Sequence, residues 1–294
     1  MTASSGRLRL PGITVIALLS GLGAGMWLGV AVGVAGGVAV LLAGLVLSRT
    51  PRGPRDFQRP DEIEAATDLT VMASLPELLD ADAAMVQVLR DPASPLAGSL
   101  RTLYTTLLAT SPAGPPLTVA LGSAEAGEGR SLLAATLGRL LASRGHRVLL
   151  IDADWRHPDQ HRLFQVPNLQ GLAELLAPRP PGLDEVVRTD PVSGLDLIPA
   201  GTGRLGARRL LSNPMKRLLS DLTGSYELVL IDLPPVLAAT DVLLLSRIVD
   251  RILFAIRWKH TRRGRAMGAL ARLRKVRGQV AGIVLTRVGE DTTS

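Results

Sequence analysis

The chain has 294 residues, enough for one large domain and a smaller segment, and an apolar content of 47% supports a buried core. It contains no cysteine, which excludes disulfide bonds, thiol chemistry and metal sites built on thiolates. The formal net charge is +7, and 30 of the 33 basic residues are arginine, a share that genome composition can explain as well as function. The basic net charge is compatible with a nucleic acid or an anionic membrane surface as partner.

The first predicted element is a membrane anchor over residues 1–49. Within it, residues 10–48 form an uncharged run of 39 residues, whereas one membrane span needs roughly 20. A single helix of this length would measure about 58 Å, nearly twice the hydrocarbon thickness of about 30 Å. We therefore expect a hairpin of two short transmembrane helices that turns near Gly29 and Val30. The flanking arginines are Arg7 and Arg9 before the run, and Arg49, Arg52, Arg55 and Arg59 after it.

This placement of arginine predicts that both ends of the hairpin, and the domain that follows, lie in the cytoplasm. Residues 50–95 are predicted to be a juxtamembrane linker, because residues 50–67 are rich in Pro, Arg, Asp and Glu. With a membrane anchor next to it, this basic linker favours anionic lipid over nucleic acid as a partner.

Residues 96–294 are predicted to form the second domain. It starts with a helix over residues 96–110, after which strands and helices alternate. The expected strands are residues 117–121, 147–152, 195–199, 228–232, 251–256 and 280–286, and the expected helices are residues 131–143, 208–222 and 262–276. Near-continuous apolar strands between helices predict an α/β fold with a doubly wound, mostly parallel sheet. Ligands of such sheets bind at the carboxyl ends of the strands.

A glycine-rich loop joins the first expected strand to its helix in the sequence VALGSAEAGEGRSLL, residues 119–133. Gly122, Gly127 and Gly129 allow backbone N–H groups to wrap a polyphosphate. The standard pattern GxxxxGK[ST] adds a lysine for the β- and γ-phosphates and a hydroxyl for Mg²⁺. Here Ser131 supplies the hydroxyl and Arg130 stands in the lysine position. The loop predicts that the protein binds a nucleotide, but it does not decide whether the protein turns that nucleotide over.

Carboxylates follow two of the expected strands. The run VLLID ends in Asp152 and is followed by Asp154, and LVLID ends in Asp232. Beside a phosphate loop, such groups can hold Mg²⁺ directly or through water, and can orient or deprotonate a nucleophile. A lone aspartate at a strand end is more often a turn or helix cap, but its conjunction with the loop favours the functional interpretation.

The order of the motifs GSAEAGEGRS, VLLIDADWRHPDQHRLF, GLAELL, LDLIPAG, YELVLIDLPPVLAATD and AGIVLTRV resembles the bacterial tyrosine autokinases of capsule and exopolysaccharide synthesis. These kinases belong with the Min and Par ATPases among the deviant P-loop proteins. The resemblance covers about residues 94–288. It implies a P-loop NTPase domain at the inner membrane that uses ATP and Mg²⁺. It also implies a partner membrane protein that controls polysaccharide chain length or export, and assembly into a homo-oligomer.

The resemblance also assigns roles to residues. The nucleotide-binding residues would be Gly127, Glu128, Gly129, Arg130, Ser131, Leu132 and Thr286, and the magnesium ligands would be Ser131, Asp152 and Asp232. The catalytic residues would be Arg130, Asp152, Asp154 and Asp232. Either Asp152 or Asp154 would act as base toward a tyrosine hydroxyl or water, and Asp232 would be the Walker B carboxylate.

Several positions depart from the family pattern. The planar guanidinium of Arg130 fits a tight loop less well than the ammonium of a lysine does. Thr286 stands where the family commonly has an asparagine at the adenine. Gly98, Arg101 and Tyr104 stand in place of the glutamate and two arginines that contact the next subunit. The tail reads VGEDTTS, and Tyr104 and Tyr226 are the only tyrosines, so autophosphorylation of a C-terminal tyrosine cluster is not expected.

Three hypotheses follow. The first is a membrane-anchored ATPase that transfers phosphoryl groups to a tyrosine of a partner, or hydrolyses ATP slowly, within polysaccharide assembly. The second is a catalytically degenerate relative that acts as a nucleotide-binding scaffold or regulator. The third is a membrane-held positioning ATPase of the Min and Par kind. Ser131, Asp152, Asp154 and Asp232 favour the first hypothesis, whereas Arg130, Thr286 and the missing tyrosines favour the second.

Overall fold

The computed structural model describes residues 9–10, 13–14, 56–77, 80–111, 114–115, 117–203, 213–240 and 242–289. The chain divides into two units, Met1–Gly53 and Pro54–Ser294. The described part of the first unit is a two-residue antiparallel pairing of β1 (Arg9–Leu10) with β2 (Ile13–Thr14). The rest of the predicted transmembrane hairpin lies outside the described residues. Among the helices that the structure describes, none is both long and apolar enough to cross a membrane.

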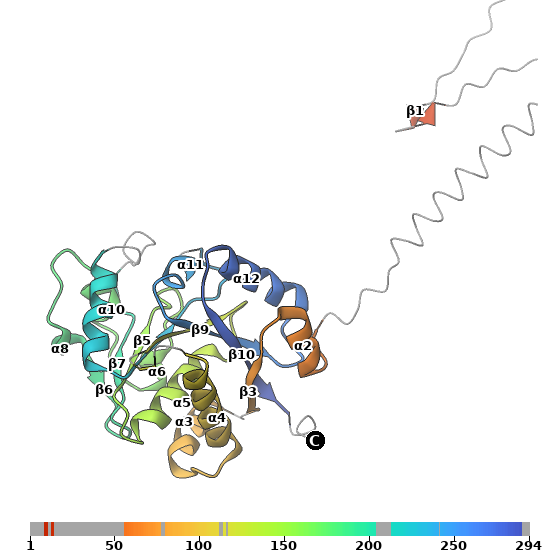
Figure 1. Cartoon of the computed structure of the whole chain (residues 1–294). Helices are drawn as coiled ribbons and strands as arrows, with labels where there is room; N and C mark the ends of the chain where they lie inside the picture. The colour runs from red at the N-terminus through yellow and green to blue at the C-terminus, as the bar shows by residue number, and fades with distance from the viewer. Residues whose placement is uncertain are drawn as a thin grey trace, which may run out of the picture. The chain divides into compact units, whose positions relative to one another are not determined.

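The second unit is built on an eight-stranded sheet with the order β3-β10-β9-β4-β8-β5-β7-β6 (Figure 1). Its strands are β3 (Val71–Pro76), β4 (Leu117–Ser123), β5 (Val148–Asp152), β6 (Arg188–Thr189), β7 (Asp196–Ile198), β8 (Leu228–Asp232), β9 (Arg251–Arg257) and β10 (Val280–Val288). All neighbouring pairs are parallel except β6 with β7. Every residue of β4, β5 and β8 is buried, as expected for central strands of a sheet covered on both faces.

Helices cover both faces of this sheet. Helices α3, α4 and α5 share one apolar cluster with one face, and α2, α10, α11 and α12 share a second cluster with the other (Figure 1). The helices are α2 (Pro60–Thr67), α3 (Ala81–Arg90), α4 (Pro95–Ala109), α5 (Arg130–Ala142), α6 (Gln160–Leu163), α7 (Leu172–Leu175), α8 (Leu183–Val186), α10 (Asn213–Ser225), α11 (Val242–Leu245) and α12 (Arg263–Lys275). The doubly wound, mostly parallel sheet predicted from the sequence is confirmed.

The predicted elements correspond closely to the observed ones. Each of the six expected strands overlaps one strand, namely β4, β5, β7, β8, β9 and β10, and the helices expected over residues 96–110, 131–143 and 262–276 are α4, α5 and α12. The helix expected over residues 208–222 begins at Asn213 as α10. Residues 208–212 lie outside the described residues.

The stretch assigned to a linker from composition, residues 50–95, differs from that expectation. It holds α2, β3 and α3, and β3 pairs in parallel with β10 at the edge of the sheet. Phe57 and Ile63 are 2% and 0% exposed and belong to the apolar cluster beneath α12. The packing of α2 could not be predicted from its charged and proline-rich composition, because the helix buries a single large apolar side chain and is otherwise polar.

The register of the central strands brings the carboxyl ends of β4, β5 and β8 level with one another. Asp152, the last residue of β5, lies opposite Asp232, the last residue of β8. On the other side of β8, Leu121 of β4 is the partner of Asp232, just before the glycine-rich loop begins. Parallel strands bring their carboxyl ends to one edge, so this register places the loop and both aspartates together.

Candidate functional site

The glycine-rich loop leaves β4 and becomes helix α5 at Arg130. Gly127 and Gly129 both have φ of +78°, in the left-handed region that favours glycine. A Cβ on Gly129 would also lie 3.1 Å from Cβ of Thr286. Successive N–H groups in such a turn, together with the free N–H groups at the start of α5, form a cradle for anions. The loop therefore has the backbone geometry of a phosphate site.

Three side-chain hydrogen bonds brace this loop. Glu128 is 3% exposed, and its Oε2 accepts from the backbone N–H of Glu125 (3.0 Å) while its Oε1 accepts from the Thr261 hydroxyl (2.7 Å). The Thr286 hydroxyl donates to the carbonyl oxygen of Glu128 (2.7 Å). Burial raises the pKa of Glu128, and the hydrogen bonds to its carboxylate from Thr261 and the backbone of Glu125 only partly oppose the rise. Thr286, expected at the adenine, thus uses its hydroxyl to hold the loop.

A cavity of about 590 Å³ opens at the loop, within the usual range of ligand pockets, roughly 300–1,000 Å³. All seven residues predicted to bind nucleotide line it, from Gly127 to Leu132 and Thr286. Among the predicted aspartates, Asp154 also lines it. Asp152 and Asp232 are 0% exposed and do not line the cavity.

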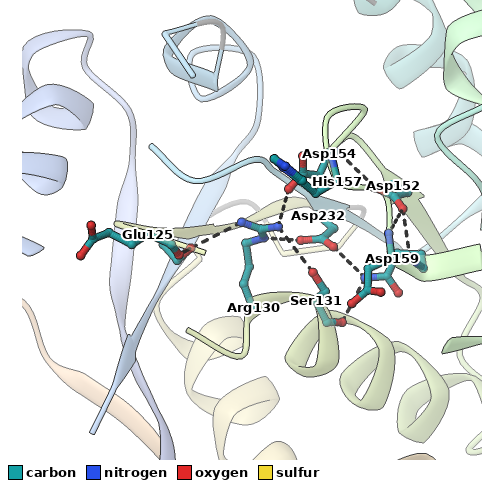
Figure 2. Close-up of polar contacts among 10 residues, drawn as sticks. Glu125, Arg130, Ser131, Asp152, Asp154, His157, Asp159 and Asp232 are labelled. Atoms are coloured by element: carbon teal, nitrogen blue, oxygen red, sulfur yellow. Dashed lines mark hydrogen bonds and ion pairs between the residues drawn. The ribbon is translucent and has the colours of Figure 1, made fainter. Parts of the chain in front are cut away.

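The side chain of Arg130 turns away from solvent and binds two of these aspartates (Figure 2). Its Nε donates to Oδ1 of Asp232 (2.5 Å), and its Nη2 donates to Oδ2 of Asp154 (2.9 Å). Weaker contacts of 3.4 Å join it to the hydroxyls of Ser123 and Ser131. Arg130 is 7% exposed. Burial by itself would lower the pKa of Arg130, but the charges and hydrogen bonds of Asp232 and Asp154 raise it overall. The guanidinium stays charged.

The remaining oxygens of the buried aspartates are also occupied. Asp152 accepts from the backbone N–H of Asp154 (3.0 Å) at Oδ1, and from those of Asp159 and Gln160 (both 3.1 Å) at Oδ2. Oδ2 of Asp232 accepts from the Gln160 side-chain amide (2.8 Å). Burial, followed by the charge of Asp232, raises the pKa of Asp152 to about 8. Sequence reasoning missed Gln160, which lies in the segment after β5 without any recognisable signal.

This arrangement does not fit the predicted magnesium site. Every carboxylate oxygen of Asp152 and Asp232 already accepts a hydrogen bond from the protein. The Ser131 hydroxyl lies 3.4 Å from a guanidinium nitrogen of Arg130. In the part of the chain that the structure describes, no three His, Asp or Glu side chains are grouped as metal ligands. The carboxylate oxygens that would bind the metal are thus already occupied by N–H groups of the protein.

The tyrosines and the predicted subunit-contact positions lie elsewhere. Tyr104, on α4, stacks edge-on against His146 with ring centroids 5.3 Å apart. Tyr226 donates to Oδ2 of Asp196 (2.8 Å), and burial, then this hydrogen bond, raises its pKa. Neither tyrosine lines the cavity. Arg101 donates to the carbonyl oxygen of Pro92 (2.5 Å), and Gly98 lies one turn before it on α4.

A glycine-rich loop between a central parallel strand and a helix N-terminus, with carboxylates ending the neighbouring strands, defines a P-loop NTPase. The family model of the CobQ/CobB/MinD/ParA nucleotide binding domain matches residues 119–294. The tyrosine-protein kinase YwqD of Bacillus subtilis is 32% identical over 57% of this chain and 70% of its own length. The chain therefore belongs to the CobQ/CobB/MinD/ParA nucleotide-binding family and, within it, to the bacterial tyrosine-protein kinases.

Two further comparisons also give relatives that are named tyrosine kinases. The structure of the BceF tyrosine kinase domain is 33% identical, with a TM-score of 0.70, over 79% of this chain and 99% of that domain. EpsB of Ralstonia nicotianae is 34% identical over 79% of this chain but only 32% of its own length. The chain thus spans about a third of the length of EpsB.

Proposed function

We propose that this chain binds ATP in the loop cavity and transfers its γ-phosphoryl group to a tyrosine of another chain, or slowly to water. The observation that carries this proposal is the cavity of about 590 Å³, which joins the anion cradle of residues 127–131 to the carboxylate of Asp154. The likeness to proteins named tyrosine kinases supports tyrosine as the acceptor.

The proposed chemistry assigns a separate task to each group. The loop N–H groups and the start of α5 hold the phosphates, and the Arg130 guanidinium, paired with Asp154 and Asp232, is the fixed positive charge next to the loop. The acceptor oxygen forms a bond to the γ-phosphorus while the bond to the β,γ-bridging oxygen breaks and ADP leaves. Asp154 takes the acceptor's proton. Asp154 suits this role better than Asp152 because it lines the cavity and accepts from one backbone N–H, that of His157, whereas Asp152 does not line the cavity and accepts from three backbone N–H groups.

The proposed setting is the bacterial inner membrane. The uncharged segment of residues 10–48 would anchor the chain as a hairpin, with the N-terminus and the P-loop domain in the cytoplasm. The partner would be a membrane protein that controls polysaccharide chain length or export, and it would carry the acceptor tyrosine. The resemblance to the autokinases supports this setting and a homo-oligomeric assembly. Anionic lipid would meet the basic stretch of residues 49–59.

A second candidate function is a nucleotide-binding regulator without turnover. The observation that favours it is the pairing of Arg130 with Asp154 and Asp232, which occupies the carboxylates that catalysis would use. In that case bound nucleotide would change the shape or assembly of the protein, and no phosphoryl group would be transferred.

Turnover of ATP by the full chain separates these functions. We expect slow release of phosphate by the natural protein, and at least about tenfold faster release by Arg130→Lys, because an ammonium lacks the rigid fork that bridges both aspartates and would hold Asp154 less firmly. Asp154→Asn should lose the activity in both backgrounds. The measurement is steady-state phosphate release with Mg²⁺ present.

Two results would contradict the kinase proposal. Activity that persists in Asp154→Asn would show that the turnover comes from another site or a contaminant. Nucleotide binding without turnover in the natural protein and in Arg130→Lys would favour the regulator. Melting curves of each variant control for misfolding.

A further inference from the structure

The role proposed for Arg130 as a positive charge at the loop does not explain the position of its guanidinium. In a P-loop the basic residue after the last glycine is expected to point toward the phosphates. Here the side chain lies against the ends of β5 and β8, where Nε contacts Asp232 at 2.5 Å and Nη2 contacts Asp154 at 2.9 Å (Figure 2). The planar fork thus bridges the carboxylate that ends β8 and one that lies two residues after the end of β5.

The same guanidinium also reaches the hydroxyl that would bind a metal. Nη2 lies 3.4 Å from Oγ of Ser131. Arg130 therefore contacts two of the three predicted magnesium ligands, Ser131 and Asp232. The third, Asp152, is closed by backbone N–H groups of Asp154, Asp159 and Gln160. A divalent ion would have to displace hydrogen bonds at all of its ligands.

Gln160 reinforces this arrangement from the opposite side. Its side-chain amide donates to Oδ2 of Asp232 (2.8 Å) and to the carbonyl oxygen of Ser131 (3.0 Å). Gln160 is 0% exposed. Both oxygens of Asp232 are therefore held by protein donors, one of which is charged. A buried carboxylate that is paired and hydrogen-bonded in this way needs no further cation.

We propose that the guanidinium of Arg130 takes the place of the divalent cation in this P-loop, so that nucleotide binds equally well without Mg²⁺. The inference rests on the proposed nucleotide binding at the loop. A guanidinium supplies several N–H donors in a fixed plane and can satisfy carboxylates and a phosphate oxygen together, whereas the ammonium of a lysine is a point charge on a flexible stem. Arg130→Lys should release one aspartate and restore dependence on a metal.

The test is equilibrium binding of ADP and of a non-hydrolysable ATP analogue to the full chain, measured by calorimetry in Mg²⁺ and in EDTA. For the natural protein we expect dissociation constants that agree within about twofold, and for Arg130→Lys a loss of at least about tenfold in EDTA. Arg272→Lys, at an exposed position on α12, is the matched control and should behave as the natural protein.

The outcomes distinguish the two proposals. If Mg²⁺ strengthens binding to the natural protein about tenfold or more, the inference is overturned while nucleotide binding stands. If nucleotide binds in neither condition, the proposed function fails and the inference fails with it. A titration with Mn²⁺ alone, followed by electron paramagnetic resonance, adds a readout without nucleotide. We expect that Mn²⁺ does not bind to the loop site of the natural protein, and binding at this site would overturn the inference.

Discussion

Replacement of Asp190 by alanine should lower the free energy of unfolding by about 3–5 kcal/mol, because it leaves a buried guanidinium without its counter-charge. Arg139 of α5 donates to both oxygens of Asp190, at 2.9 and 3.0 Å, and the two residues are 9% and 4% exposed. The same guanidinium donates to the carbonyl oxygen of Met85 (2.9 Å), and Ser193 donates to Asp190 (2.5 Å). This pair ties α5 to α3 and to the turn between β6 and β7.

Urea unfolding of the full chain measures this effect. Asp61→Ala is the matched control, since Asp61 pairs with Arg59 at an exposed site and should show no measurable change. The double variant Arg139→Met with Asp190→Leu should recover much of the loss, because no charge is then left buried. A loss below about 1 kcal/mol in Asp190→Ala would mean that the pair behaves like a surface ion pair.

The same pair predicts a dependence on pH. Burial by itself would raise the pKa of Asp190, but the hydrogen bonds from Arg139 and Ser193, with the charge of Arg139, lower it below its usual range. A carboxyl whose pKa is lowered by folding stabilises the protein above its unfolded pKa of about 3.9. This contribution is lost as the pH falls through the lowered pKa. In Asp190→Asn the free energy of unfolding should therefore vary less over this acidic range.

Replacement of Gly171 by alanine should lower the free energy of unfolding by about 3 kcal/mol or more, at the upper end of the cost of overpacking. Gly171 precedes α7, and a Cβ there would overlap the carbonyl oxygen of Pro199 and the backbone nitrogen of Gly201. Backbone atoms cannot move aside as a flexible side chain does. The start of α7 is held against the end of β7 by the hydrogen bond from Leu172 N–H to the Pro199 carbonyl (2.8 Å), so alanine should break this junction.

Gly268→Ala provides the matched control on α12. A Cβ at Gly268 would meet nothing within 4 Å, and alanine is favoured over glycine inside a helix by about 1 kcal/mol. The two substitutions add the same methyl group and should shift the urea midpoint in opposite directions. Equal shifts would show that the close approach at Gly171 does not decide the outcome.

The central sheet could be predicted because its strands are short apolar runs that need burial on both faces, as VLLID and LVLID show. The meeting of Asp152 with Asp232 followed from the same argument, since parallel strands end at one edge. Strand β3 was missed because VMASLP is less uniformly apolar than these runs and directly follows a polar, proline-rich stretch. Its place was set by pairing with β10, more than two hundred residues later in the chain.

The direction of the Arg130 side chain was beyond sequence reasoning. The loop motif gives its place in the chain, but its conformation depends on Asp232, 102 residues away, and on the partners that already close Asp152. Gln160 and the Glu128–Thr261 contact are similar cases, because a side chain braced by distant residues leaves no periodic signal.

The pairing of β3 with β10 sets a lower limit on the part of the chain that can be studied alone. A fragment that begins at residue 96 would lose β3 and leave the nine-residue β10 as an open edge of the sheet. An unpaired edge of buried, apolar residues is a template for joining a second copy, so such a fragment would tend to aggregate. Phe57, which is 2% exposed and belongs to the apolar core, extends this limit, so the shortest self-contained piece must begin before it.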